Sequence, residues 1–160
     1  MRAKKYDIRI RENRLPYLVT VGQTRITDGE TYQTPEKIAD LIRKIYHVER
    51  AAEEHVYMVA FDLHFHLVGL FEISHGTSYE SAVDSAQIIQ RAMLIGSQNV
   101  CIIHNHPSGD PEPSADDGRF TKRLKAATDI CGIRLTDHLI VAGACKNKFY
   151  SYRENTDLLG

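Results

Sequence analysis

Long apolar runs are missing from this sequence. No segment approaches the roughly twenty apolar residues that a membrane-spanning helix needs, and the basic N-terminus lacks the apolar core of a signal peptide. Cysteine is also scarce, with three residues and no Cys-x-x-Cys pair. We therefore expect no membrane segment, and a cytoplasmic protein with reduced thiols rather than a disulfide framework. Cys101 lies inside an apolar run and is interpreted as a core residue.

The sequence has no strong charge of either sign. Its 20 basic and 21 acidic residues give a formal net charge of −1, which argues against a strongly basic nucleic-acid binder. The first fourteen residues are locally basic, with six Lys or Arg against Asp7 and Glu12. We interpret this segment as a solvated arm, and nucleic-acid binding by it is the less favoured alternative.

The length of 160 residues is sufficient for one domain with a substantial core. Residues 1–33 predict an N-terminal arm with one or two short strands, which can pair as a hairpin. Residues 34–160 predict one α/β domain with a mixed β-sheet flanked by helices. The expected strands are 56–61 and 67–73 (an antiparallel hairpin), 100–103, 139–141 and 149–152; the expected helices are 34–53, 84–95 and 114–132. The inward faces of the first two helices should comprise Ile38, Leu41, Ile42, Ile45 and Ile88, Ile89, Ala92, Met93.

Residues 101–117, CIIHNHPSGDPEPSADD, carry the strongest chemical signal. His104 and His106 follow an apolar strand at positions i and i+2, which point to the same face of an extended chain. A loop rich in Pro and Gly follows, and Ser114 then has the character of a helix N-cap, which places Asp117 in the first helical turn. Two imidazoles and one carboxylate that leave a fourth position to water form a catalytic zinc site. The plainer alternative is that the three side chains only hydrogen-bond the loop.

The spacing His-x-His, seven residues, Ser, two residues, Asp resembles the JAMM motif of the JAB/MPN metallopeptidase-like family. The segment HNHPSGDPEPS is similar to the RadC branch of that family. The resemblance implies a JAB/MPN (cytidine-deaminase-like) architecture, one Zn²⁺ per chain, and hydrolysis of peptide or isopeptide bonds in a peptide or protein substrate. RadC proteins usually carry a helical DNA-binding-like domain ahead of this region, and residues 1–33 do not resemble it.

A metal hydrolase also needs a proton-transferring group outside the ligand set. In JAMM proteins this is a glutamate just before the first central strand, and the resemblance assigns that role to Glu54. Glu53 and Glu72 are the rival candidates. The resemblance also assigns Ser114 to stabilisation of the oxyanion, in addition to its capping role.

Other histidines offer weaker candidates for the site. His64 and His66 form a second His-x-His at a predicted turn, with no helix-starting carboxylate behind it. His47, His55 and His75 are interpreted as surface or hydrogen-bonded residues. His138 resembles part of a recurring DHLIV segment in the RadC branch and is either an outer support for the metal ligands or a structural hydrogen-bonding residue.

Two other functions remain as alternatives. The first is a DNA-repair or mobile-element-associated nucleic-acid protein, which near-neutral charge and the absence of a basic–aromatic stripe disfavour. The second is a zinc-stabilised interaction module without catalysis.

Overall fold

A single seven-stranded sheet organises the computed structural model, which describes residues 1–76, 83–143 and 148–159. The strand order is β2-β1-β4-β3-β5-β6-β7. Strands β1 and β4 pair in parallel, as do β5 and β6, while the other neighbours are antiparallel, so the predicted mixed α/β sheet is confirmed. The strands are β1 (Arg2–Ile10), β2 (Pro16–Arg25), β3 (Glu54–Phe61), β4 (Leu67–Gly76), β5 (Asn99–His106), β6 (Arg134–Ala142) and β7 (Phe149–Ser151).

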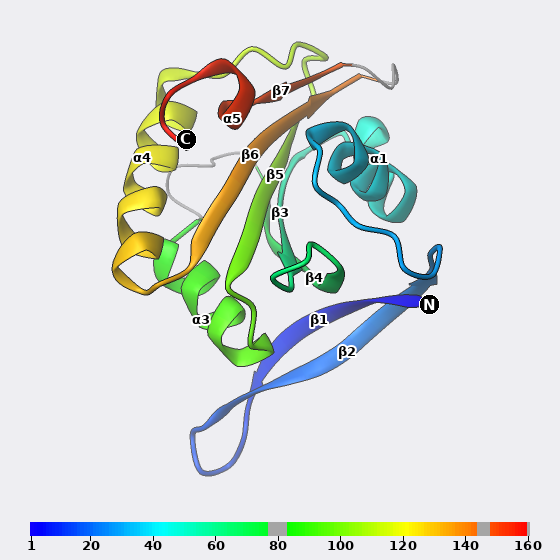
Figure 1. The fold of residues 1–160 in the computed structure, drawn as a ribbon, viewed down its shortest axis with the longest axis vertical. Helices are drawn as coiled ribbons and strands as arrows, with labels where there is room; N and C mark the ends of the chain where they lie inside the picture. Colours follow the sequence, from blue (N-terminus) through cyan, green and yellow to red (C-terminus); the bar gives the residue numbers. More distant parts are fainter. Residues whose placement is uncertain (77–82, 144–147, 160) are drawn as a thin grey trace.

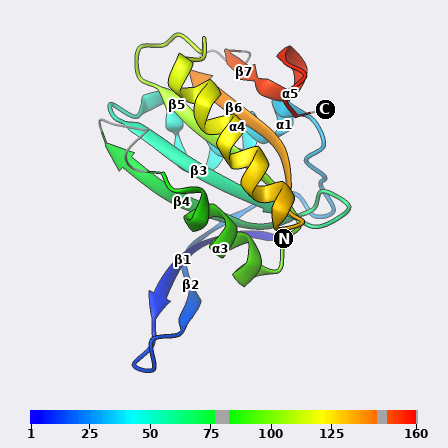
Figure 2. The same ribbon diagram turned by 90° about the vertical axis from the view of Figure 1, so that its left-hand side faces the viewer.

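Helices cover both faces of the sheet (Figures 1 and 2), and the alternation of side chains along β3 separates the two cores. Tyr57, Val59 and Phe61 belong to the core under α1, whereas Val56 and Met58 belong to the core under α3 and α4. The predicted hairpin of β3 and β4 is confirmed. The helices are α1 (Pro35–Tyr46), the 3₁₀ helix η1 (Val48–Arg50), α3 (Ser85–Ile95), α4 (Ala115–Ile130) and α5 (Tyr152–Asn155).

The first helix is shorter than predicted. Its expected buried stripe is confirmed, but the helix ends at Tyr46 instead of continuing to residue 53. His47 adopts a left-handed conformation with φ 52°, and its N–H donates to the Arg43 carbonyl, a common way to end a helix. The 3₁₀ turn that follows buries Val48, so the apolar pattern continues after the α-helix has ended.

Helix α3 begins one residue after the predicted start. The Asp84 carboxylate accepts a hydrogen bond from the Ala86 N–H, and Gly96 ends the helix at φ 72°. Ile88 and Ala92 are fully buried as predicted, but the prediction for Met93 is wrong, because it is 58% exposed. No helix in the described ranges is long and apolar enough to cross a membrane.

The N-terminal residues form a long hairpin that joins the sheet. Strands β1 and β2 have 9 and 10 residues, and β1 pairs with β4 at Lys5↔Leu70 and Tyr6↔Phe71. Figures 1 and 2 show the far end of this hairpin extending beyond the helices. The expected hairpin is therefore present, but its strands are not short as predicted, and the middle of β1 attaches it to the edge of β4.

The C-terminal edge strand is also present, although it is one residue shorter than predicted. Strand β7 ends at Ser151, and Tyr152 begins the short helix α5. Cys101 is fully buried on β5, as expected, and burial raises the pKa of its thiol well above the ordinary value. Cys145, one of the three cysteines expected to be reduced, lies outside the described residues.

Candidate metal centre

Three separate elements bring four polar side chains to one end of the sheet. Strand β5 extends beyond its predicted end and carries both His104 and His106. Helix α4 places Asp117 in its first turn, and β3 begins at Glu54. One ligand atom from each of these residues lies within 4.8 Å of those of the other three, so the group can hold a metal ion.

The separations among the two histidines and the aspartate suit a tetrahedral zinc ion. The Nε2 atoms of His104 and His106 are 3.0 Å apart, and they lie 3.3 Å and 3.6 Å from the nearer carboxylate oxygens of Asp117. Two ligand atoms bound to tetrahedral zinc at its usual bond length are about 3.4 Å apart. The donor set therefore fits zinc with little movement.

A chain of hydrogen bonds fixes which nitrogen of His104 carries the proton. The Thr121 hydroxyl donates to the Asp117 carbonyl at 2.6 Å, so its oxygen can only accept at its contact of 2.7 Å with Nδ1 of His138. The Nε2 atom of neutral His138 is then an acceptor, and it receives the Nδ1–H of His104 at 2.9 Å. The lone pair of His104 Nε2 is therefore directed into the centre.

His106 is oriented in the same sense by a different partner. Its Nδ1 lies 2.9 Å from the Asp110 carbonyl oxygen, which can only accept, so Nδ1 carries a proton. In the neutral ring, the Nε2 lone pair then faces His104 Nε2 at 3.0 Å. Two lone pairs at this distance repel each other unless a cation, either a proton or a metal ion, lies between them. This arrangement is the second observation that fits a metal ion.

The N-cap of α4 holds the carboxylate of Asp117. The backbone N–H and the hydroxyl of Ser114 both donate to Asp117 Oδ2, at 2.7 Å and 2.6 Å, and the Ser114 oxygen accepts from the Asp117 N–H at 3.1 Å. This reciprocal capping box confirms the predicted N-cap. Burial by itself would raise the pKa of Asp117, but the adjacent His106 and His104 rings and the hydrogen bonds from Ser114 together lower it below the ordinary value.

Glu54 lies beside the three other residues and is more exposed than Asp117. Its Oε1 atom is 3.8 Å from His104 Nε2, and its side chain is 23% exposed, compared with 3% for Asp117. Burial raises the pKa of the Glu54 carboxyl, an effect that His106 opposes and Asp117 reinforces. Glu54 therefore lies close enough to the other three residues to bond a water molecule held between them.

Asn105 fixes the backbone on both sides of Glu54. Its Oδ1 accepts from the His55 N–H at 2.8 Å, and its Nδ2 donates to the Glu53 carbonyl at 2.9 Å. Asn105 and Thr121 were not identified from the sequence. Their positions in the sequence could have indicated them. Asn105 lies between the two histidines of the site, and Thr121 follows Asp117 by one helical turn.

The rival candidates lie elsewhere. Glu53 is exposed and contributes its backbone carbonyl rather than its carboxylate. Glu72 lies beside His55 on the opposite face of the sheet. His66 pairs with Asp62 at 3.0 Å, and the described residues include no metal-binding group that contains His64 or His66. His138 is fully buried and hydrogen-bonded to His104. It is therefore a structural hydrogen-bonding residue that also supports a candidate ligand.

Comparison with known proteins gives one consistent family. The RadC-like JAB domain matches residues 32–157. A UPF0758 protein of Vibrio cholerae is 33% identical over 140 residues, which cover 86% of this chain and 84% of that protein. UPF0758 proteins of Thermotoga maritima and Coprothermobacter proteolyticus are 32% and 36% identical over 81% and 76% of this chain, but over 58% and 50% of their own lengths.

This chain thus spans only 50% and 58% of the length of two of these relatives. The family match covers most of the chain and includes β3, β5 and α4, which carry the four residues of the centre. The match to the relative from Vibrio cholerae covers more than four fifths of both chains. The chain belongs to the RadC-like JAB domain family.

Proposed function

We propose that this protein is a zinc-dependent hydrolase of the JAMM type that cleaves peptide or isopeptide bonds. Membership of the JAB family and a group of side chains that can hold a metal ion support metal-dependent hydrolysis. The observation that carries the finer proposal is the position of Glu54, whose carboxylate faces His104 Nε2 at 3.8 Å, just outside the closely spaced His104, His106 and Asp117.

His104, His106 and Asp117 would hold one zinc ion. When bound there, zinc supplies a Lewis acid that lowers the pKa of a water molecule to about 7. Thr121 and His138 keep the His104 ring in the tautomer that presents Nε2, while the Asp110 carbonyl does the same for His106. These contacts orient the ligands before the metal arrives, which reduces the cost of assembling the site.

Glu54 would move the proton. Its carboxylate accepts a proton from the attacking water and then delivers it to the nitrogen of the leaving amine. The raised pKa of Glu54 suits the first transfer, because a carboxylate with a raised pKa accepts the proton of the water more readily. Asn105 accepts a hydrogen bond from the His55 N–H and donates one to the Glu53 carbonyl, which holds Glu54 in position for both transfers.

Ser114 would contribute to stabilisation of the oxyanion, as the JAMM resemblance implies. Its hydroxyl proton is directed toward Asp117 in this structure, so donation to an oxyanion requires the hydroxyl to rotate. Ser114 also positions Asp117 through the capping box, and this second role does not depend on substrate.

An extended peptide would approach along the edge of β4. The register of β1 reaches Tyr6↔Phe71, which leaves the backbone from Glu72 to Gly76 without a β1 partner in the described chain. Free N–H and C=O groups of a strand edge bind an extended segment by adding it to the sheet. A cytoplasmic location is part of the same proposal, as expected from the sequence.

The decisive test is hydrolysis of a complex peptide library by the zinc-loaded protein, with mass spectrometry of the new termini. The matched control is Glu54→Gln, prepared and loaded in the same way. Cleavage by the wild type that is lost in the variant would support the proposal. Equal cleavage by both proteins would point to a contaminating protease, and an absence of cleavage in peptide and isopeptide libraries alike would favour the non-catalytic zinc module.

A further inference from the structure

A second cluster of metal-binding side chains lies on the opposite face of the sheet from Glu54. His55 follows Glu54 on β3, so its side chain points to the α1 face, where Tyr57 is packed. His75 on β4 pairs directly with His55, and Glu72 pairs with Tyr57. Because directly paired residues point to the same side of a sheet, all three polar side chains share the α1 face.

An irregularity in β4 makes this arrangement possible. Glu72 and His75 are three residues apart, and in a regular strand they would point to opposite faces. The register passes from Val56↔Ser74 to Tyr57↔Glu72, so Ile73 is an extra residue on β4. This bulge returns Glu72 to the same face as His75.

The three side chains converge on a small volume. His55 Nδ1 and His75 Nδ1 lie 2.9 Å and 3.6 Å from the same oxygen of Glu72, and the candidate ligand atoms all lie within 4.8 Å of one another. The imidazole rings of His55 and His75 stack with their centroids 5.6 Å apart. A carboxylate between two imidazoles provides three donors in a geometry close to that of a metal site.

We propose that His55, Glu72 and His75 bind a second divalent metal ion of the kind that prefers imidazole ligands, such as Zn²⁺. Ligand atoms around tetrahedral zinc are about 3.4 Å apart, so the two Nδ1–Oε1 separations already bracket the required value. Rotation of the more exposed His75 ring would bring its nitrogen closer, because 66% of that side chain is accessible. The site needs no movement of the backbone.

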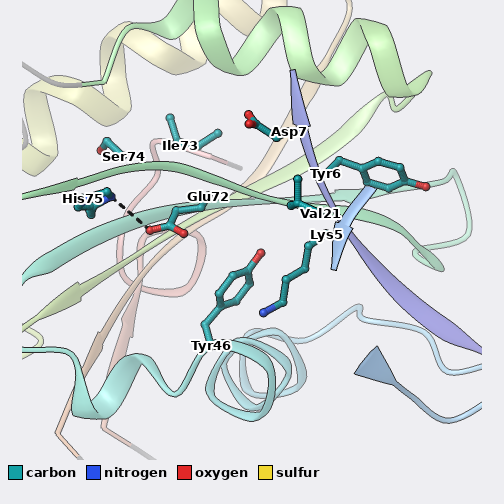
Figure 3. A pocket seen from close by; sticks show the side chains of 9 residues that line it. All are labelled: Lys5, Tyr6, Asp7, Val21, Tyr46, Glu72, Ile73, Ser74 and His75. Atoms are coloured by element: carbon teal, nitrogen blue, oxygen red, sulfur yellow. Dashed lines mark ion pairs between the residues drawn. The ribbon is translucent and has the colours of Figure 1, made fainter. Parts of the chain in front are cut away.

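The surroundings leave room for a further ligand. Glu72 and His75 line a hollow of about 390 Å³ at the point where β1 diverges from β4, together with Lys5 and Tyr46 (Figure 3). The Lys5 ammonium is held by the Ile45 carbonyl at 3.2 Å and by the Tyr46 ring. Lys5 is therefore tied to α1, and the open side of the cluster faces the hollow, where water or a polar group of a ligand can complete the coordination.

Such an ion would join β3 to the bulged part of β4 one residue from Glu54. The His55 N–H also donates to Asn105, whose two hydrogen bonds fix the backbone on both sides of Glu54. Occupation of the second site would therefore stiffen the strand end that positions Glu54, from the face opposite the first centre.

The test is a metal count on the full chain after removal of bound metal with a chelator. Zn²⁺ is titrated in competition with a chromophoric chelator into the wild type and into His75→Ala, Glu72→Gln and the control His64→Ala. We expect two ions per chain in the wild type and the control. In His75→Ala and Glu72→Gln, the second ion should be lost, or its affinity should fall by at least about 10–100-fold. Removal of an outer supporting group alone reduces metal affinity by that amount.

A site-specific measurement makes the result independent of stoichiometry. Paramagnetic Co²⁺ should shift the ring signals of His55 and His75 in a His106→Ala background, where the first centre is impaired. Circular dichroism checks that each variant is folded. A single ion in the wild type that is lost in His106→Ala, a second ion that persists in both His75→Ala and Glu72→Gln, or Co²⁺ that leaves His55 and His75 unshifted would each overturn the proposal.

Discussion

The Thr121 hydroxyl oxygen lies 2.7 Å from Nδ1 of His138, and this contact determines how His104 faces the candidate metal centre. Both residues are fully buried, so no solvent competes for the hydrogen bond. Because the Thr121 proton is donated to the Asp117 carbonyl, His138 must donate its own proton to Thr121. His138 can then accept only from His104 Nδ1.

We therefore predict that Thr121→Val weakens zinc binding without abolishing it. Valine keeps the volume of threonine but cannot accept the His138 proton, so the orientation of His104 is no longer fixed. Loss of such outer supports typically reduces metal affinity about 10–100-fold. Competition titration with a chelator measures the change.

Thr128→Val is the matched control. Thr128 is also fully buried on α4, and its hydroxyl bonds the Lys125 carbonyl, away from the centre. Equal zinc affinities for the two variants would show that the Thr121 contact does not act on the metal.

The second prediction concerns the ligands themselves. His106→Ala should remove zinc from the first centre, because only His104 and Asp117 remain of the three closely spaced ligands. Zinc retained at His64 and His66 in this variant would contradict the assignment. The measurement is elemental analysis after dialysis against a weak chelator, with His66→Ala as the control that should keep its zinc, since His66 pairs with Asp62.

The third prediction separates proton transfer from metal binding. Glu54→Gln should retain the fold and the zinc but lose hydrolytic activity by about 10²–10⁴-fold, the usual contribution of general acid–base catalysis. Glu53→Gln is the control and should be nearly fully active, because its exposed side chain is not part of the metal group. The two variants are compared by initial rates on the best peptide from the library. A larger loss in Glu53→Gln would transfer the role to that residue.

The local part of the centre could be predicted from sequence because it lies within seventeen consecutive residues. Strand alternation places His104 and His106 together, and the capping signal at Ser114 places Asp117 three residues later. Both inferences need only the geometry of one strand and one helix end.

The position of Glu54 depends on a pairing between distant segments. Val56 lies opposite His104 in the register of β3 and β5, so Glu54, two residues before Val56, shares the face of the ligands. His55, the next residue on β3, points the other way, and Glu53 precedes the strand. Only family resemblance distinguished Glu54 from Glu53 in the sequence, since the register was not known.

Helix ends and exposed apolar residues were harder to predict. The helical pattern continues past Tyr46 because Val48 is buried through a 3₁₀ turn, and a left-handed His47 gives no signal comparable to glycine. Met93 has the right spacing for the core, yet it is exposed, because α3 buries a stripe narrower than the pattern suggests.

The fourth prediction concerns the acid stability of the metal-free protein. Burial lowers the pKa of His138 to about 4, below the ordinary value of 6.5 that applies to the unfolded chain. Above pH 6.5 both states are neutral and the full stability is present; as the pH falls toward 4, the unfolded chain binds a proton that the folded chain refuses. His138 alone should therefore reduce the free energy of unfolding by about 2 kcal/mol between about pH 7.5 and about pH 5.

Urea denaturation at the two pH values measures this loss, and His138→Gln is the comparison. The variant should lose less stability on acidification than the wild type, although the buried His104, whose pKa is also lowered, still contributes. Identical pH dependence in the two proteins would show that His138 is not the source of the effect.

The last prediction distinguishes a peptidase from a nucleic-acid protein. A DNA-processing site needs a basic track toward the metal, whereas Arg119, Lys122 and Arg123 are exposed on α4, and the buried Phe120 and Leu124 mark the face turned to the core. The remaining basic cluster lies on the N-terminal hairpin, whose far end extends away from the helices (Figure 2).

Binding of single- and double-stranded DNA is measured at two salt concentrations, for the wild type and for a variant with Arg9, Arg11 and Arg14 changed to glutamine. We expect no salt-sensitive affinity tighter than about 10⁻⁶ M, the upper end of ordinary non-specific binding. Tighter binding that weakens steeply with salt and disappears in the variant would replace the peptidase proposal with a DNA-binding role for the hairpin.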